Sequence, residues 1–372
     1  MKIIHCSDLH LDSKMTSNLD SKKARERRDE ILLTFQKLVR YAKEQKVKVI
    51  LIAGDMFDKN KITVKAKNIV KDAILNANDI DFLYLKGNHD EASFIGEDEE
   101  IPENLKMFSK EKWISYKYDI DDKNEDKIHQ RKINITGIEF GGISDSQIYN
   151  SLILDKNDIN IVCMHGQESV YDGKDKTEII NLQNLKNKNI DYLALGHIHK
   201  YKEQKLDSRG IYCYSGCLEG RGFDECNEKG FVLLEIKNNE ISRTFIPFAK
   251  RTLHEVKVDI TGTNTTNEAI EKIQQYLRGI SKSDLVKIIL TGKVELESER
   301  DIDFILRKYQ EEFYFVKVYD ETSPIIDYSK YEYDASLKGE FIRLILSEKI
   351  TDKEKQEIIM TGLKALSGEE LD

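Results

Sequence analysis

The sequence contains no long apolar run. Its 372 residues are 40% hydrophobic and 34% charged, and its apolar runs end after a few residues, far short of the ~18 that a membrane-spanning helix needs. The segment from Met1 to Asp8 reaches charged residues at once and lacks the apolar stretch of a secretory signal. We therefore expect a globular protein with neither a transmembrane helix nor a secretory signal.

A disulfide-type cysteine pattern is also lacking. The chain has five cysteines, an odd number, and they are not tightly spaced. Cys213, Cys217 and Cys226 lie near one another in the sequence, but no Cys-x-x-Cys pair or fourth ligand accompanies them. Reduced thiols are therefore favoured over a zinc site. We expect the protein to work in the reducing cytoplasm.

The chain has no excess of positive charge. Its 58 basic and 67 acidic residues give a net charge of −9, which argues against a basic nucleic-acid coat. A nucleic-acid enzyme is still compatible, because metal ions and a few local cations can bind phosphate on an otherwise acidic protein. One basic cluster starts a predicted helix, and a solvated helix face is favoured over phosphate binding there. The cluster consists of Lys22, Lys23, Arg25, Arg27 and Arg28.

Short apolar runs alternate with helix-like stretches in the first part of the chain. The runs are at 3–4, 49–53, 82–85, 161–164 and 192–195. Runs without internal alternation predict strands buried on both faces, and the amphipathic helices expected at 25–43 and 64–77 predict βαβ units. Two more strands are expected at 113–118 and 132–138, with a solvated charged loop at 119–131. The pattern predicts a layered α/β fold.

The pattern changes near 247–251. Beyond it, strands at 254–260, 285–290 and 313–318 alternate with helices at 267–278 and 300–309, which predicts a small βαβαβ module. Two amphipathic helices follow at 336–348 and 352–366. We predict a main domain at 1–250, a capping domain at 251–325 and C-terminal helices at 326–372.

Metal-type side chains follow each apolar run of the first part. Because ligands bind at the carboxyl ends of strands in α/β sheets, these side chains are expected to converge. Oxygen and imidazole donors without thiolate favour Mn²⁺, Fe²⁺ or Zn²⁺. The donors exceed the needs of one ion, so two ions with a bridging carboxylate are expected. The candidate ligands are Asp8, His10, Asp55, Asn88, His165, His197 and His199.

The order and spacing of these motifs resemble the calcineurin-like metallophosphoesterases. The motifs are Asp8-x-His10, Gly54-Asp55-x-x-Asp58, Gly87-Asn88-His89-Asp90, His165 and Gly196-His197-x-His199. The resemblance implies a sandwich of sheets flanked by helices. It also implies one ion on Asp8, His10 and His199, a second on Asn88, His165 and His197, and Asp55 bridging both. A metal-bound hydroxide would attack phosphorus, while His89, oriented by Asp58, would protonate the leaving oxygen or stabilise the phosphate charge.

A narrower resemblance covers the whole chain. It rests on Ser7 to Ser13, Met164-His165-Gly166, Gly196 to His199 and the loop from Tyr214 to Arg221. These segments resemble the nuclease component of the bacterial SbcCD complex (SbcD) and related DNA repair exonucleases, although Ser215 stands where that family often has proline. The resemblance implies a Mn²⁺-dependent exonuclease and endonuclease of DNA repair and recombination. It also implies a homodimer and a coiled-coil ATPase partner of the SbcC type. Apart from the resemblance, Arg221 lies on a Gly-rich loop soon after the last metal motif, which makes it a candidate for contact with a scissile or neighbouring DNA phosphate.

Two other functions remain open from the sequence. The same metal site would serve hydrolysis of a small phosphoester, and the chain would alternatively tether DNA ends with weak catalysis. The helices at 336–348 and 352–366 also leave two interpretations, since they either pack on the capping domain or dock into a partner. In the resembled family, the partner at this place is the coiled coil of the ATPase.

Overall fold

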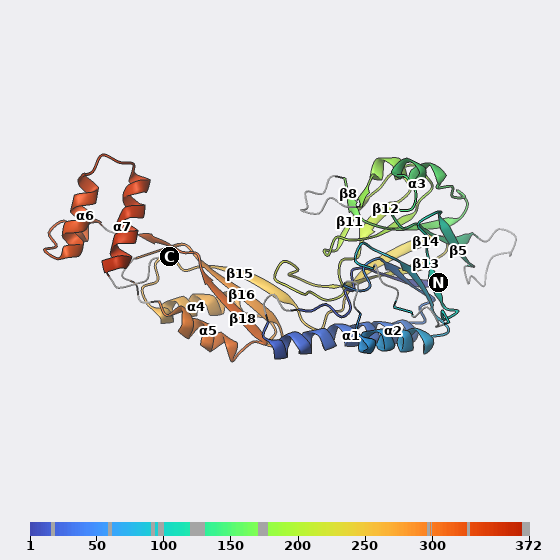
Figure 1. The fold of residues 1–372 in the computed structure, drawn as a ribbon, viewed down its shortest axis with the longest axis horizontal. Helices are drawn as coiled ribbons and strands as arrows, with labels where there is room; N and C mark the ends of the chain where they lie inside the picture. Colours follow the sequence, from blue (N-terminus) through green and yellow to red (C-terminus); the bar gives the residue numbers. More distant parts are fainter. Residues whose placement is uncertain are drawn as a thin grey trace. The chain divides into compact units, whose positions relative to one another are not determined.

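The computed structural model describes residues 1–15, 19–58, 62–90, 94, 95, 100–119, 131–169, 178–295, 298, 300–325 and 328–366. The chain forms two compact units, Met1–His254 and Glu255–Asp372, drawn together in Figure 1. Most of the predicted loop at 119–131 lies outside the described residues, and so do 326, 327 and 367–372 of the C-terminal segment.

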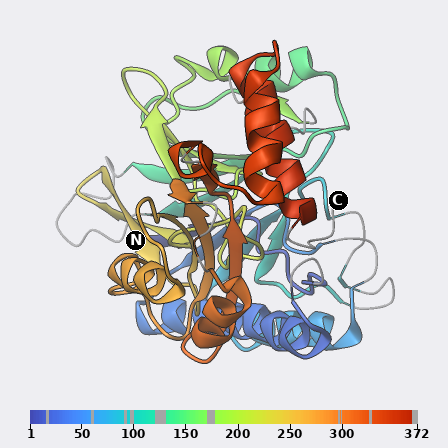
Figure 2. The ribbon, with the colours of Figure 1, turned by 90° about the vertical axis from the view of Figure 1, so that its left-hand side faces the viewer.

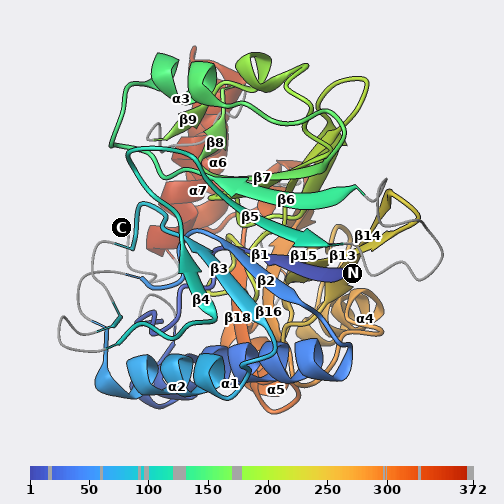
Figure 3. The same cartoon turned by 90° about the vertical axis from the view of Figure 1, so that its right-hand side faces the viewer.

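Two six-stranded sheets form the frame of the first unit (Figure 3). The first sheet has the order β14 (Glu240–Pro247), β13 (Gly230–Lys237), β1 (Lys2–Cys6), β2 (Val49–Ala53), β3 (Asp81–Leu85) and β4 (Leu105–Met107). The second has the order β11 (Lys202–Lys205), β12 (Ile211–Tyr214), β10 (Tyr192–Gly196), β7 (Ile159–His165), β6 (Lys132–Gly137) and β5 (Ile114–Asp119). Two short strands, β8 (Gln167–Glu168) and β9 (Ile179–Ile180), form a separate parallel pair.

Helices flank both sheets. The long helices α1 (Ser21–Glu44) and α2 (Val64–Leu75) contact each other and cover the outer face of the first sheet. The helix α3 (Asp145–Ser151) and the 3₁₀ turn η1 (Leu182–Leu185) pack on the outer face of the second. The side chains of Asp20 and Thr63 cap the starts of α1 and α2 by accepting backbone N–H groups. The predicted layered fold with flanking helices is confirmed.

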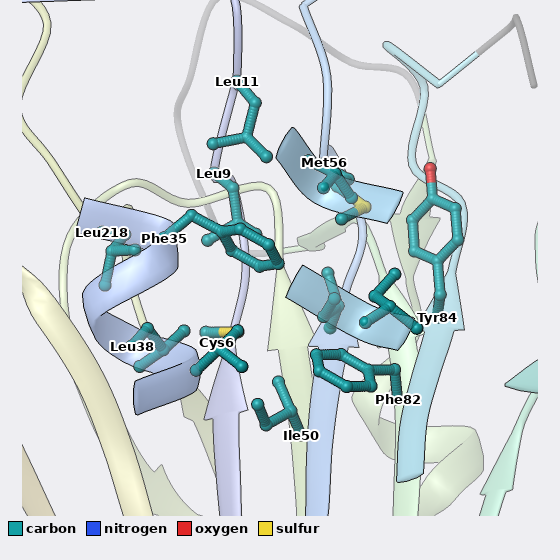
Figure 4. Close-up of a cluster of buried hydrophobic side chains, with 14 of the residues drawn as sticks. Cys6, Leu9, Leu11, Phe35, Leu38, Ile50, Met56, Phe82, Tyr84 and Leu218 are labelled. Carbon is teal, nitrogen blue, oxygen red and sulfur yellow. The ribbon is translucent and has the colours of Figure 1, made fainter. Parts of the chain in front are cut away.

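Apolar layers hold the sandwich together. Ile3, Leu51 and Leu83 of the first sheet meet Ile135 and Ile161 of the second, and all are buried. The other face of the first sheet packs on α1, with its core side chains gathered as in Figure 4. That figure labels Cys6, Leu9, Leu11, Phe35, Leu38, Ile50, Met56, Phe82, Tyr84 and Leu218. Burial on both faces explains why β2 is apolar along its whole length and why β7 is apolar from Ile161 to Met164.

One member of the basic cluster is not solvated. Arg27 is fully buried, and its guanidinium donates to Glu30 at 2.7 Å and to Glu219 at 3.2 Å. The predicted solvated face is therefore wrong for Arg27, because the helical repeat turns this position toward the core. Lys22 and Arg25 are exposed as expected.

The second unit contains the predicted alternation of strands and helices, coloured from yellow to orange in Figure 2. Its main sheet has the order β15 (Leu253–Asp259), β16 (Leu285–Thr291) and β18 (Phe315–Asp320), with β16 and β18 parallel. The helices α4 (Thr266–Tyr276) and α5 (Ile302–Gln310) share an apolar core with this sheet. A second parallel pair is formed by β17 (Lys293–Glu295) and β19 (Ser323–Ile325).

The C-terminal helices form a pair. The 3₁₀ turn η2 (Tyr328–Tyr331) precedes α6 (Leu337–Ser347) and α7 (Asp352–Leu366), which contact each other (Figure 1). Ile342, Ile359 and Leu363 are buried against Tyr331 in a cluster of their own. The apolar stripes of these helices therefore bury one side within the pair.

None of the five cysteines, all of which lie in the described part of the chain, is joined in a disulfide. Among the described residues, no helix has the length and apolar character needed to cross a membrane.

Candidate metal centre

The candidate ligands lie where the C-terminal ends of five strands meet. The strands β1, β2 and β3 are parallel neighbours in the first sheet, and β7 and β10 are parallel neighbours in the second. The ring of His165, at the end of β7, lies 2.9 Å from the backbone oxygen of Ala53, at the end of β2. The backbone N–H of His197 donates to the Asp8 carboxylate at 3.0 Å. These contacts join the two sheets at the predicted edge.

The first donor cluster consists of Asp8, His10 and His199. The Nε2 atoms of the two rings are 3.1 Å apart, and His199 Nε2 is 3.7 Å from Asp8 Oδ1. Asp8 and His10 are buried, whereas His199 is partly exposed. Ser7 donates to Asp8 Oδ2 at 2.5 Å and contacts Ser215, where the resembled family often has proline, at 2.8 Å.

The second donor cluster consists of Asn88, His165 and His197, with Asp55 beside it. Asn88 Oδ1 lies 3.1 Å from His165 Nε2 and 3.4 Å from His197 Nδ1. Asp55 Oδ2 is 3.4 Å from His165 Nε2 and 3.9 Å from His10 Nε2 of the first cluster. Asp55 therefore lies between the clusters, the position that a bridging carboxylate requires.

The backbone at the strand exits is specialised for these positions. Asp8, His10, Asp55 and His197 have positive φ, from 43° to 98°, a region that non-glycine residues seldom adopt. Gly54 has φ of 90°, and a Cβ there would lie 2.0 Å from the ring of His165. A sharp turn without a side chain is therefore what admits His165 beside β2.

The proton positions on the rings indicate a site for cations. His165 Nδ1 faces a carbonyl oxygen, so it carries a proton, and in the neutral ring Nε2 is left as an acceptor facing the oxygens of Asn88 and Asp55. In the first cluster, His199 Nδ1 faces the Glu225 carboxylate at 2.7 Å, so its Nε2 also faces other acceptors. Acceptors that face one another repel unless positive charge lies between them. The donor set therefore fits divalent ions.

The pKa of His165 reports the same negative environment. Burial, the strongest influence, would lower the pKa of this ring. The carboxylates of Asp55, Asp8 and Glu178 together outweigh burial and raise the pKa to about 10. The surroundings of the ring therefore stabilise positive charge.

His89 and Asp58 lie beside the donor clusters. His89 Nδ1 is 3.4 Å from Asp58 Oδ1, and its side chain is 39% exposed. The same Asp58 oxygen is 3.5 Å from His10 Nδ1, and Ser13 donates to the other oxygen at 2.9 Å. Asp58 therefore lies beside Nδ1 of both His10 and His89, while Nε2 of His10 faces the first cluster.

Comparison with known proteins identifies the family. The sequence model of calcineurin-like phosphoesterases matches residues 1–201, more than half of the chain and all of the candidate ligands. The chain belongs to the calcineurin-like phosphoesterases.

Three relatives align with a larger part of the chain than the family model does. The uncharacterized metallophosphoesterase YhaO of Bacillus subtilis is 25% identical, with 78% of this chain and 72% of YhaO covered. The DNA double-strand break repair protein Mre11 of Methanocaldococcus jannaschii is 27% identical, with 80% of this chain and 77% of Mre11 covered. The SbcD component of the nuclease SbcCD of Staphylococcus saprophyticus is 26% identical, with 66% of this chain and 69% of SbcD covered.

Two residues of the loop after β12 lie beside the candidate metal centre. Arg221, predicted from the sequence, lies 2.9 Å from Glu225 Oε1 and 3.8 Å from Asp58 Oδ1. Glu225, which was not predicted, is buried and contacts the ring of His199. Burial would raise the pKa of Glu225, but bonds from His199 and Arg221 outweigh it and lower the pKa.

Two more acidic residues were missed as parts of the site. Asp90 is buried and accepts the backbone N–H groups of Met56, Phe57 and Gly87 at 2.9 to 3.1 Å, which ties the exits of β2 and β3 together. Asp90 ends the motif Gly87-Asn88-His89-Asp90, and this position is the sequence signal that could have marked it as part of the site. Glu178 presents an oxygen within 4.8 Å of ligand atoms of His165 and His197, and nothing in its sequence neighbourhood marked it.

Proposed function

We propose that this phosphoesterase is a metal-dependent phosphodiesterase that acts on DNA, as the nuclease subunit of an SbcCD-like repair complex. The observation that carries the proposal is the position of Asp55 between two separate donor clusters. Two such clusters, sharing one carboxylate, match the requirement for two ions that together hold a phosphate.

The chain's own residues would hold the ions in two groups. Asp8, His10 and His199 would bind one ion and Asn88, His165 and His197 the other, with Asp55 contacting both. When bound, such ions supply positive charge to the phosphate oxygens and lower the pKa of water toward neutrality. Nitrogen and oxygen donors without thiolate suit Mn²⁺, which we propose as the working metal.

His89 is proposed as the proton donor rather than a ligand. Its partial exposure leaves a face of the ring open to substrate, and Asp58 lies on the side of Nδ1. The carboxylate would accept the Nδ1 proton and hold the ring so that, in its doubly protonated form, Nε2 donates its proton to the leaving oxygen or to the phosphate. Arg221, beside Asp58, would add a positive charge near a DNA phosphate.

The choice of DNA as substrate rests on the relatives. Two of the three carry names of a nuclease and of a DNA repair protein. The alignment with Mre11 covers 80% of the chain, whereas the family match ends at residue 201. The similarity therefore reaches past the segment that any phosphoesterase would share.

Assembly is part of the same proposal. The helices α1 and α2 expose Leu33, Val64 and Leu75, and we propose them as the contact of a homodimer. The helices α6 and α7 belong to the predicted C-terminal segment at 326–372. This pair of helices would bind the coiled coil of an SbcC-like ATPase. Light scattering at micromolar concentration tests the first point, since a monomeric mass would contradict it.

A release assay with Mn²⁺ tests the activity. Linear duplex DNA, single-stranded DNA and a cyclic dinucleotide are compared, with an Asp55→Ala variant as the inactive control. Release of nucleotides from DNA supports the proposal. Hydrolysis of the cyclic dinucleotide alone would make the chain a small-phosphoester enzyme, and DNA binding without hydrolysis would make it a tether.

A further inference from the structure

We propose that Glu225 is a positioning residue that orients His199 in the metal centre. This inference rests on the proposed function, because it assumes that the first donor cluster holds an ion. Glu225 lies in the loop after β12, and His199 follows β10, 26 residues earlier.

The contact between these residues fixes one nitrogen of the ring. Glu225 Oε1 lies 2.7 Å from His199 Nδ1, the distance of a strong charge-assisted hydrogen bond. The opposite nitrogen, Nε2, then faces His10 Nε2 at 3.1 Å and Asp8 Oδ1 at 3.7 Å. The carboxylate therefore selects both the tautomer of the ring and the nitrogen that points into the cluster.

Glu225 is itself held firmly. Its side chain is buried, and Oε2 accepts the backbone N–H of Arg221 at 2.8 Å. The Arg221 guanidinium donates to Oε1 at 2.9 Å. Arg221 also lies 3.3 Å from His199 Nδ1, but a guanidinium only donates, so both groups converge on the same acceptor.

His199 needs such support more than the other two donors of its cluster. It is partly exposed, whereas His10 and Asp8 are buried. An imidazole that lacks a partner for its second nitrogen can rotate and adopt either tautomer. Loss of a carboxylate partner of this kind costs about 10–100-fold in metal affinity in known metal sites.

The loop offers a matched control. Glu219 is also buried, but it accepts from Thr34 at 2.7 Å, from the backbone of Lys250 at 2.7 Å and from Arg27 at 3.2 Å. None of these partners belongs to a donor cluster. Glu219→Gln should therefore disturb the loop without acting on His199.

The experiment measures Mn²⁺ binding to the full chain by calorimetry, with the number of ions checked by electron paramagnetic resonance. Glu225→Ala should weaken one of the two ions by about 10–100-fold and leave the other unchanged. Glu225→Gln should recover part of the loss, because its amide oxygen can still accept from His199. Its amide NH2 group only donates, so the bond from the Arg221 backbone N–H is lost. Glu219→Gln should bind both ions as the unaltered chain does.

Thermal unfolding of the metal-free variants separates positioning from loop damage. A loss of affinity in Glu219→Gln equal to that in Glu225→Ala would overturn the inference, as would two ions bound at unchanged affinity by Glu225→Ala. If the unaltered chain bound no Mn²⁺ at all, the proposed function itself would fail. The two failures are therefore distinguishable.

Discussion

At the scale of single residues, four of the candidate metal donors have strained backbone conformations. Asp8, His10, Asp55 and His197 all have positive φ, and each such residue costs on the order of 1–3 kcal/mol. Hydrogen bonds around the site offset this cost. The backbone N–H of His89, for example, donates to Asp55 at 2.9 Å. The fold accepts unfavourable backbone geometry in order to direct these side chains inward.

Asp55 should matter more to metal binding than any donor that belongs to one cluster. Its Oδ2 lies within 4 Å of ring nitrogens of both clusters, so Asp55→Ala should weaken both ions and abolish hydrolysis. Asn88→Ala should weaken one ion only, because Asn88 contacts His165 and His197 alone among the donors. Metal analysis after dialysis checks the difference. Two ions retained by an active Asp55→Ala variant would refute the site.

His89 should separate chemistry from metal binding. His89→Ala should keep both ions while the hydrolysis rate falls by roughly 10²–10⁴-fold, the usual contribution of a general acid. The measurement pairs the rate at saturating Mn²⁺ with the number of bound ions. If an ion is lost from this variant, His89 is a ligand, and the group of His10, Asp58 and His89 becomes part of the metal site.

The sequence predicts the donors of this site but not the residues that hold them. Asp8, Asn88 and His197 each follow a buried apolar run, and parallel strands bring their ends to one edge. Glu225 follows no such strand directly, since it sits in a loop whose path depends on tertiary packing. Its role becomes visible only when the loop is folded against His199.

At the scale of elements, strands with an apolar signal are predictable and wholly polar strands are not. The apolar runs correspond to β1, β2, β3, β7 and β10, and the strands expected at 113–118 and 132–138 correspond to β5 and β6. The edge strand β11 has the sequence Lys-Glu-Gln-Lys and is largely exposed, so it carries no hydrophobic signal. A strand of this kind forms because β12 offers it hydrogen bonds.

A buried ion network connects α1 with distant segments. Glu30 accepts from Arg27 at 2.7 Å, from Lys250 at 2.5 Å and from Arg251 at 2.7 Å. Burial alone would raise the pKa of Glu30, but these three cations outweigh it and lower the pKa to about 2, from an ordinary 4.5. The network fixes α1 against the chain segment that leads out of the first unit.

Glu30→Gln should therefore destabilise the fold in a pH-dependent way. The folded state has the lower pKa, so ionised Glu30 contributes stability above pH 4.5 and loses it as the pH falls toward 2. The cost at pH 7 should be roughly 3 kcal/mol, and it should shrink between pH 4.5 and 2. Urea unfolding at several pH values measures it. A cost that did not change with pH would show that packing, not charge, is lost.

At the scale of the whole molecule, the C-terminal pair has two distinct sides. Tyr331, Ile342, Ile359 and Leu363 are buried in its own cluster. Leu337 and Leu344 are exposed on α6, as are Ile358 and Leu366 on α7. Leu337 and Leu344 are seven residues apart, so they lie on one face of the helix. Exposed apolar faces of this kind mark interaction sites.

Substitution of this exposed side should abolish partner binding while sparing the fold. Leu344 is 59% exposed and Ile358 is 42% exposed, so glutamate at both positions should cost little stability, because neither side chain fills the core of the pair. The same charges should prevent insertion into an apolar partner and lower affinity for an SbcC-type ATPase by at least tenfold, since burying a charge without a partner costs more than about 1.4 kcal/mol. Glu340→Gln, on an exposed position of α6, is the control and should bind normally. Calorimetry measures binding, and nuclease activity on short DNA should remain. Undiminished binding of the double variant would place the ATPase contact elsewhere on the chain.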